Sequence, residues 1–343
     1  MTHTADVPRR KPSRPGLYGP FVFAIVLGIV WSGVWVWLKG ETERRLDAAA
    51  SQLRAGGWKV AWATRQLGGY PFRLDVDFTG LTLAEPSGWA LSAPQLKTEA
   101  YAYQPSRWIM VAPAGVTFTR PVGGPVSVGA QVLRASVSHW EQNPPRISVE
   151  GVGLTFAPAP GAKPFFVQSA QGLDLHTLAG PNDQGAIYFG LDGARGQLPG
   201  LMGRIAEGGP INLTGDAIFS HASQVAGPDW PSAVRRWSRS GGALQVRQVT
   251  VQAGEALLDA RTGLISVDDN GRLSGSITAA LRQAPRALTA MSQAGAIRPE
   301  AAAQSAAALA ASPGADAAHV TLDFQAGQTR LGPVTIGPAP KVF

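Results

Sequence analysis

Apolar and polar residues alternate along most of the chain, which is the pattern of β-strands with one buried face. In RLDVDF, residues 73–78, the three apolar side chains fall on one face and the three charged ones on the other. After Gly80 the apolar positions become Leu81 and Leu83, so the phase has shifted by one residue. A β-bulge or a tight bend beside Gly80 explains the shift, because one extra residue turns every later side chain to the opposite face.

Similar shifts occur in residues 126–137 and 244–251. In residues 147–156 the expected position of the shift is Gly151, with Val152 continuing the apolar face. Long strands with repeated bulges predict a strongly coiled sheet. Short turns rich in Gly, Pro, Asn and Asp, such as Asp268-Asp269-Asn270-Gly271, predict hairpins and antiparallel pairing. Further strand candidates are 89–103, 107–119, 165–177, 185–194, 211–219, 255–267, 271–281 and 317–326.

The N-terminal region carries a different pattern, a continuous apolar run over residues 21–38 without a charged side chain. Eighteen helical residues span about 27 Å, close to the thickness of a bilayer core. Four basic residues precede the run, and three tryptophans lie in its second half. The run is longer than the apolar region of a cleaved signal peptide. We therefore expect a retained anchor with a cytoplasmic basic tail, residues 1–20, and the rest of the chain on the opposite side.

Helical patterns are few. Residues 41–55 favour an amphipathic helix that continues the anchor and stops at Gly56-Gly57, which places a juxtamembrane helix in residues 39–57. Other candidates are 230–239, 284–293 and 299–311. These helices cannot cover the apolar face of a dozen strands. Residues 58–343 are therefore expected to form a mainly β domain whose sheet either packs on itself, as a sandwich or flattened barrel, or leaves an open groove.

Composition narrows the classes of function. The net charge is +7, but the 30 Lys and Arg residues are scattered, apart from a group in the first fourteen positions. This distribution is unlike a nucleic-acid-binding face and points to a membrane surface. The chain has no cysteine, which excludes disulfides and thiol chemistry.

The sequence contains no recognisable catalytic motif, and the five histidines are too far apart in sequence for a paired metal-ligand spacing. Asp75 and Asp77 are the best carboxylate pair, because same-face strand neighbours are about 6.5–7 Å apart, a separation that suits an inverting glycosidase. A solvated face paired with Arg73 is the favoured interpretation. For the aromatic residues of the segments 58–72 and 101–108, core packing is favoured over a ligand-lining role. No catalytic, metal or cofactor residue is assigned.

Two motifs carry a resemblance to a known family. After the apolar run, a tryptophan-rich segment leads to Gly69-Tyr70-Pro71-Phe72-Arg73, and the chain ends in LGPVTIGPAP, residues 331–340. Together they resemble the bacterial family called domain of unknown function 2125. In architecture that family is similar to AsmA-like envelope proteins, in which an N-terminal helix anchors a curved β-sheet. The resemblance brings no catalytic residue. The residues of the motif themselves indicate a structural role, the entry to a strand: Gly68-Gly69 lets the chain turn and Pro71 fixes φ. We expect Tyr70 and Phe72 to wedge under the edge of the sheet.

These observations together predict a non-enzymatic protein of the cell envelope, anchored in the inner membrane with its bulk in the periplasm. The excess of apolar strand face favours binding of lipid, acyl chains or another apolar ligand along the sheet. The alternative is a structural or assembly module that contacts envelope proteins. A hydrolase using Asp75 and Asp77 is the least favoured hypothesis.

Overall fold

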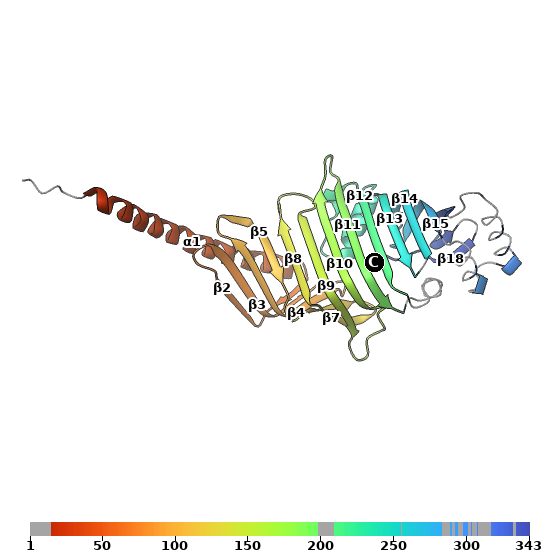
Figure 1. Ribbon diagram of the computed structural model, residues 1–343, viewed down its shortest axis with the longest axis horizontal. Helices are drawn as coiled ribbons and strands as arrows, with labels where there is room; N and C mark the ends of the chain where they lie inside the picture. Colours follow the sequence, from red (N-terminus) through yellow and green to blue (C-terminus); the bar gives the residue numbers. More distant parts are fainter. Residues whose placement is uncertain are drawn as a thin grey trace, which may run out of the picture.

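The computed structural model describes residues 15–197, 209–254, 256–282, 317–331 and 334–343, together with scattered positions between 283 and 316. Within these residues the chain forms one long N-terminal helix and a single antiparallel sheet of 18 strands (Figure 1). The predicted mainly β fold with few helices is therefore confirmed. The elements are α1 (Pro15–Ala55), β1 (Lys59–Ala61), β2 (Thr64–Gly68), β3 (Arg73–Ala84), β4 (Ala90–Tyr101), β5 (Gln104–Val111), β6 (Val116–Arg120), β7 (Gly124–Gly129), β8 (Val132–Ser138), β9 (Arg146–Pro158), β10 (Val167–Ala179), β11 (Gly185–Gly196), β12 (Ile211–Phe219), the 3₁₀ turn η1 (Ala222–Gln224), α3 (Trp230–Arg239), β13 (Leu244–Ala253), β14 (Ala256–Val267), β15 (Leu273–Arg282), β16 (Ala317–Gln325), β17 (Gln328–Leu331) and β18 (Val334–Pro338).

Among the described residues the strands form a meander in which consecutive strands pair, except β1 with β2, β5 with β6 and β7 with β8. From β9 to β18 every consecutive pair is antiparallel. At the other end, β1 and β2 both pair with β3. Among the described residues β18 pairs only with β17, so these strands leave the sheet open instead of closing it into a barrel.

In two places of the sheet, a pair of short strands takes the place of one long strand. β4 pairs with β5 through Lys97 and Val111, and with β6 through Leu91 and Phe118. β9 likewise pairs first with β8 and then with β7. The strand expected at 107–119 is therefore present as β5 and β6, interrupted at residues 112–115. The interruption bends the sheet without removing a strand from it.

Glycines with positive φ lie inside two long strands and switch which residues face inward, without a shift in the pairing register. Gly80 has φ +59°, and it separates the buried side chains of Phe78 and Leu81, as expected. The shift expected at Gly151 in β9 is instead at Gly153, with φ +61°. Gly151 is itself buried, and Val152 is 48% exposed on the outer face, so the prediction that Val152 continues the apolar face is wrong. The two glycines look alike in sequence, and only the positive φ of Gly153 distinguishes them.

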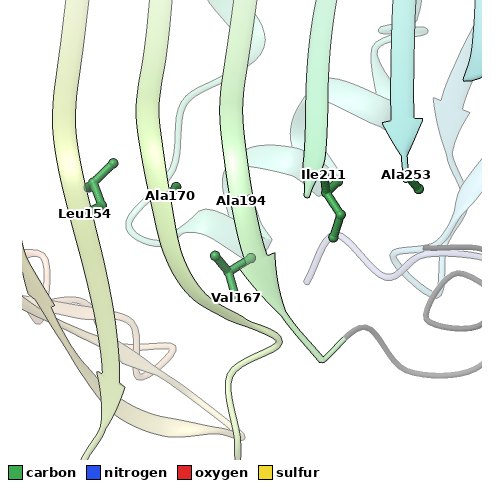
Figure 2. Packing of buried hydrophobic residues seen from close by; sticks show 6 residues of the cluster. All are labelled: Leu154, Val167, Ala170, Ala194, Ile211 and Ala253. Atoms are coloured by element: carbon green, nitrogen blue, oxygen red, sulfur yellow. The ribbon is translucent and has the colours of Figure 1, made fainter. Parts of the chain in front are cut away.

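The concave, inner face of the sheet carries the apolar core. One cluster of buried residues crosses five adjacent strands near their ends: Leu154, Val167, Ala170, Ala194, Ile211 and Ala253 (Figure 2). A second cluster around Val246, Ile265 and Phe324 covers the C-terminal strands. Helix α3 packs against that part of the sheet through Val234 and Trp237.

Helix α1 divides into two parts. Its N-terminal part extends away from the sheet, and its C-terminal part lies against the sheet (Figure 1). The predicted helix at 41–55 is confirmed as the continuation of α1, and the helix at 230–239 is confirmed as α3. The helices expected at 284–293 and 299–311 fall mostly outside the described residues.

Candidate functional site: the helix–hairpin junction and the inner groove

The motif at residues 69–73 lies at the junction between α1 and the sheet. Trp31 donates a hydrogen bond from Nε1 to the Pro71 carbonyl at 2.8 Å. One turn later, Trp35 donates from Nε1 to the Arg73 carbonyl at 2.7 Å. The indoles therefore hold the backbone of the β2–β3 hairpin along one side of the helix. Sequence reasoning predicted a strand entry here, but it did not identify the helix as the partner.

Aromatic contacts reinforce the junction. Tyr70 meets Trp35 edge to face with ring centroids 5.4 Å apart, and its hydroxyl lies 2.8 Å from Ser32 Oγ. Phe72 lies 6.5 Å from Trp31, again between ring centroids. Tyr70 and Phe72 remain 58% and 62% exposed. The idea that they wedge under the sheet edge is therefore wrong, because they flank the helix instead.

The charged face of β3 forms ion pairs within the sheet. Arg73 contacts Asp75 and Glu99, each at 3.2 Å between nitrogen and oxygen. Asp75 Oδ1 is buried and has no hydrogen-bond partner in the part of the chain that the structure describes. Asp77 lies opposite Lys97 in the sheet register. The pair considered for glycosidase chemistry thus lies on the charged outer face of the sheet and does not line the cavities described below.

A cavity of about 290 Å³ lies between α1 and the inner face of the first strands. Leu46, Ala49 and Leu53 line it from the helix. The sheet contributes mainly apolar side chains, including Trp62, Val76, Phe78, Leu96, Trp108 and Met110. Thr98 is the polar exception among these side chains, and its hydroxyl donates to the Val76 carbonyl at 3.0 Å.

The position of the helix over this cavity is fixed at the cavity's rim. Arg65 Nη1 donates to Asp47 Oδ1 at 2.6 Å, and this hydrogen bond lowers the pKa of Asp47 below its usual value. The guanidinium groups of Arg54 and Arg65 each lie 5.4 Å from the Trp62 ring. Trp62 is therefore held between two cations while it lines the cavity.

A second, wider cavity of about 560 Å³ adjoins the first through Leu83. Trp89 and Phe118 stack at its wall with ring centroids 5.2 Å apart. Trp58 and Trp230 complete the lining from sequence positions that are far apart.

Two hydrogen bonds between distant segments lie beside this second cavity. Trp58 Nε1 donates to the Pro228 carbonyl at 2.7 Å, and the Trp230 backbone N–H donates to Glu85 Oε2 at 3.0 Å. These bonds join the first strands to the start of α3. The sequence offered no signal for this contact, because nothing local relates positions 145 or more residues apart.

Between these cavities and the buried clusters, the inner face is apolar but incompletely covered. The register places Leu175 opposite both Val149 and Phe189, and Leu213 opposite both Leu191 and Val251. We call the whole set the central inner face, and every member is half-buried: Val149, Leu173, Leu175, Ile187, Phe189, Leu191, Leu213, Val249 and Val251. The predicted excess of apolar strand surface is thus located on these residues.

Residues with metal-binding chemistry do not gather. No group of three or more His, Asp or Glu side chains is placed to hold a metal ion among the described residues. His176 pairs with Ser148 at 3.0 Å between Nδ1 and Oγ and stacks on Tyr188, both on the outer face. The aromatic residues behave unevenly: Trp62 and Trp108 line the cavity, whereas Tyr101 and Tyr103 are 51% and 66% exposed. Core packing was thus the wrong expectation for these two tyrosines.

One comparison with known proteins identifies a family. The model of the family DUF2125, described as uncharacterized protein conserved in bacteria, matches residues 35–340. No curated protein and no solved structure matches the chain. The matched region begins within α1 at Trp35 and contains both the hairpin motif and the two cavities. The chain belongs to this family.

Proposed function

We propose that this member of the DUF2125 family is a non-enzymatic, membrane-anchored protein of the bacterial cell envelope that holds acyl chains in the inner groove of its sheet. Its N-terminus lies in the cytoplasm and its sheet in the periplasm. The observation that carries the proposal is the central inner face, a set of nine apolar side chains on five adjacent strands, all half-buried. Apolar surface of this kind is normally covered by a ligand, a partner or a membrane.

The cavities support an elongated apolar ligand. Their volumes of about 290 and 560 Å³ are close to or within the usual range of small-molecule sites. Leu83 borders both, so the two cavities are neighbours on the inner face. Their walls offer aliphatic and aromatic side chains and few polar groups, which suits hydrocarbon better than a sugar or a peptide.

A retained anchor is supported by packing. α1 is the one helix among the described residues long and apolar enough to cross a membrane, with an apolar window only 6% buried. Trp35, near the end of its apolar run, is nevertheless buried against Leu74 and Ala102 of the sheet. Cleavage after the apolar run would remove this tryptophan from the core of the junction. The basic residues at 9–14 favour a cytoplasmic N-terminus.

Photocrosslinking tests the groove with controls inside the same strands. A photoreactive amino acid is placed at Leu175 or Phe189 on the inner face, and at His176 or Tyr188 on the outer face. In intact cells, irradiation should give lipid adducts at 175 and 189, and several-fold fewer at 176 and 188. Adducts are identified by mass spectrometry of the purified full-length protein.

The same experiment separates the alternative function. Reproducible protein adducts at 175 and 189 without lipid adducts would replace the lipid proposal by an assembly module that docks a partner in the groove. Equal lipid labelling on both faces would show only exposure to the bilayer, and it would also reject the groove as a lipid site.

A further inference from the structure

Four aromatic side chains project from one end of the sheet. Tyr70 and Phe72 belong to the β2–β3 turn, and Tyr101 and Tyr103 belong to the β4–β5 turn. Their exposed fractions lie between 51% and 66%. The turns are neighbours, because the Ala102 backbone N–H donates to the Phe72 carbonyl at 2.9 Å. We call these four residues the aromatic tip.

Exposed aromatic side chains at two adjacent turns are unusual on a surface that faces only water. Tyr101 and Tyr103 stack with centroids 5.0 Å apart and an interplanar angle of 15°, so their rings form a continuous apolar plate. The hydroxyl groups of Tyr70, Tyr101 and Tyr103 give the aromatic tip a polar edge. Amphipathic aromatics of this type concentrate at the level of lipid headgroups.

The helix fixes the height of the tip relative to the bilayer. Trp31, which bonds the Pro71 carbonyl, lies seven residues before Leu38, the last residue of the apolar run. Seven residues correspond to about 10 Å along a helix. The tip therefore lies beside the apolar segment and not beyond its end.

At this level of α1, some side chains contact the hairpin and others are exposed and apolar. Trp31, Ser32 and Trp35 turn toward the hairpin and bond to it. Val30, Val34 and Val36 are 58%, 41% and 64% exposed, so the helix surface that does not contact the hairpin is apolar. The helix thus offers one side to the protein and the other to its surroundings at the same depth.

Electrostatic attraction is not needed to hold the tip at a bilayer. Arg73 is paired with both Asp75 and Glu99 at the base of the turns. Arg107 lines the same small cavity as Arg73, Glu99 and Tyr101. The charges of these four ionisable groups, two arginines and two carboxylates, cancel.

We propose that the aromatic tip inserts into the membrane that α1 crosses, beside the last turns of the apolar run and just below the headgroup layer, so that helix and sheet both contact that membrane. The inference rests on the membrane crossing of α1 and is independent of lipid binding in the groove. It sets the orientation of the sheet. Leu46, the first helical residue of the 290 Å³ cavity, lies eight residues after Leu38, about 12 Å along the helix. The cavity then faces the periplasmic space just above the lipid surface.

Depth-dependent fluorescence quenching tests the insertion. The native chain has no cysteine, so single cysteines can be placed at Tyr103 or Gln104 in the tip and labelled with an environment-sensitive fluorophore. Val122, 77% exposed at the β6–β7 turn beyond the other end of β4, is the matched control. The full-length variants are reconstituted in phosphatidylcholine vesicles that contain lipid with a nitroxide on its headgroup. Q104C replaces an exposed polar residue and provides a probe if Y103C folds poorly.

Quenching at positions 103 and 104 should exceed quenching at 122 several-fold, with blue-shifted emission at the first two. The difference should persist when anionic phosphatidylglycerol is added, because the charges at the tip cancel. Weak and equal quenching at all three positions would overturn the proposal, as would insertion that occurs only with anionic lipid. If photocrosslinking gave no lipid adducts at 175 and 189, the quenching result would still be expected. The two experiments therefore test lipid binding and insertion of the tip independently.

Discussion

At the scale of single residues, two indole N–H groups connect the membrane-facing helix to the sheet. Their acceptors, the carbonyls of Pro71 and Arg73, belong to a hairpin turn and lie next to side chains that remain exposed. Since exposed aromatic surface contributes little to folding, the directional bonds and the buried ring of Trp35 carry the docking.

Replacement of Trp35 by phenylalanine tests this arrangement. The variant keeps an aromatic ring against Leu74 but loses the donor to the Arg73 carbonyl, so it should lower the free energy of unfolding by about 1–3 kcal/mol. Thermal unfolding in detergent measures the effect. W37F is the control, because Trp37 is 60% exposed and the change should be within about 0.5 kcal/mol. Equal effects of the two changes would contradict the assigned role of Trp35.

The adjacent glycines 68 and 69 give a second matched pair. Gly69 has φ +97°, and a Cβ there would lie 2.7 Å from the Arg73 carbonyl oxygen, which already accepts the Trp35 bond. Nothing lies within 4 Å of a Cβ at Gly68. G69A should therefore cost about 2 kcal/mol or more, and G68A should be nearly neutral. Equal unfolding midpoints for both variants would show that the turn relaxes without loss.

At the scale of elements, α3 is the helix that the sequence predicted most completely. Asp229 caps it by accepting from the Ser232 backbone N–H at 2.8 Å, and Pro231 occupies the first turn. Hydrogen bonds from Ser232 lower the pKa of Asp229 below its usual value. The cap holds in place the helix that covers the C-terminal strands and contributes Trp230 to the wider cavity.

D229A should destabilise the protein by about 1 kcal/mol at neutral pH. Because the pKa is lower in the folded state, the contribution of the carboxylate is present above its unfolded pKa of about 3.9 and is lost as pH falls through the folded value. Unfolding in urea should therefore show a difference between wild type and D229A that shrinks below about pH 4. D269A, in the exposed β14–β15 turn, is the control and should change little at any pH.

The sequence predicted those helices and strands whose formation depends on residues close together in the chain. Alternation identified most strands, and the bend at Gly80 followed from a phase shift across a glycine, which has positive φ. The same reasoning misplaced the phase shift in β9 by two residues, because Gly151 and Gly153 look alike in sequence and only Gly153 has positive φ. The short strands β1 and β2 were missed, since three to five residues give too little alternation to detect.

At the scale of the whole molecule, the sequence predicted more apolar strand surface than its helices can cover. It did not predict on which strands the uncovered surface lies. The location depends on contacts between distant positions. The hydrogen bonds of Trp58 with Pro228 and of Glu85 with Trp230 bring the first strands to α3 and complete the wider cavity. The candidate site is therefore a property of the curvature of the sheet, and no single motif encodes it.

Two truncated chains separate the anchoring role of α1 from its structural role. A chain of residues 29–343 loses the first eight residues of the apolar run, which leaves it too short to span a bilayer, but keeps Trp31, Ser32 and Trp35. A chain of residues 39–343 loses all three. The second chain leaves Leu74 and Ala102, which are 2% and 4% exposed in the full structure, without their cover. Loss of a buried tryptophan predicts a deficit of about 3–5 kcal/mol for 39–343 relative to 29–343.

Limited proteolysis with chymotrypsin provides the measurement, because Phe72 lies in the hairpin that the indoles hold and is followed by Arg73. Cleavage after Phe72 should be slow in 29–343, as in the full-length chain, and much faster in 39–343. Equal rates in the two truncated chains would mean that the sheet folds independently of the helix, and cleavage of the anchor in cells would then be compatible with a stable protein. A fast rate only in 39–343 makes the end of the membrane helix part of the folding unit, so that the sheet cannot be released without losing its first hairpin.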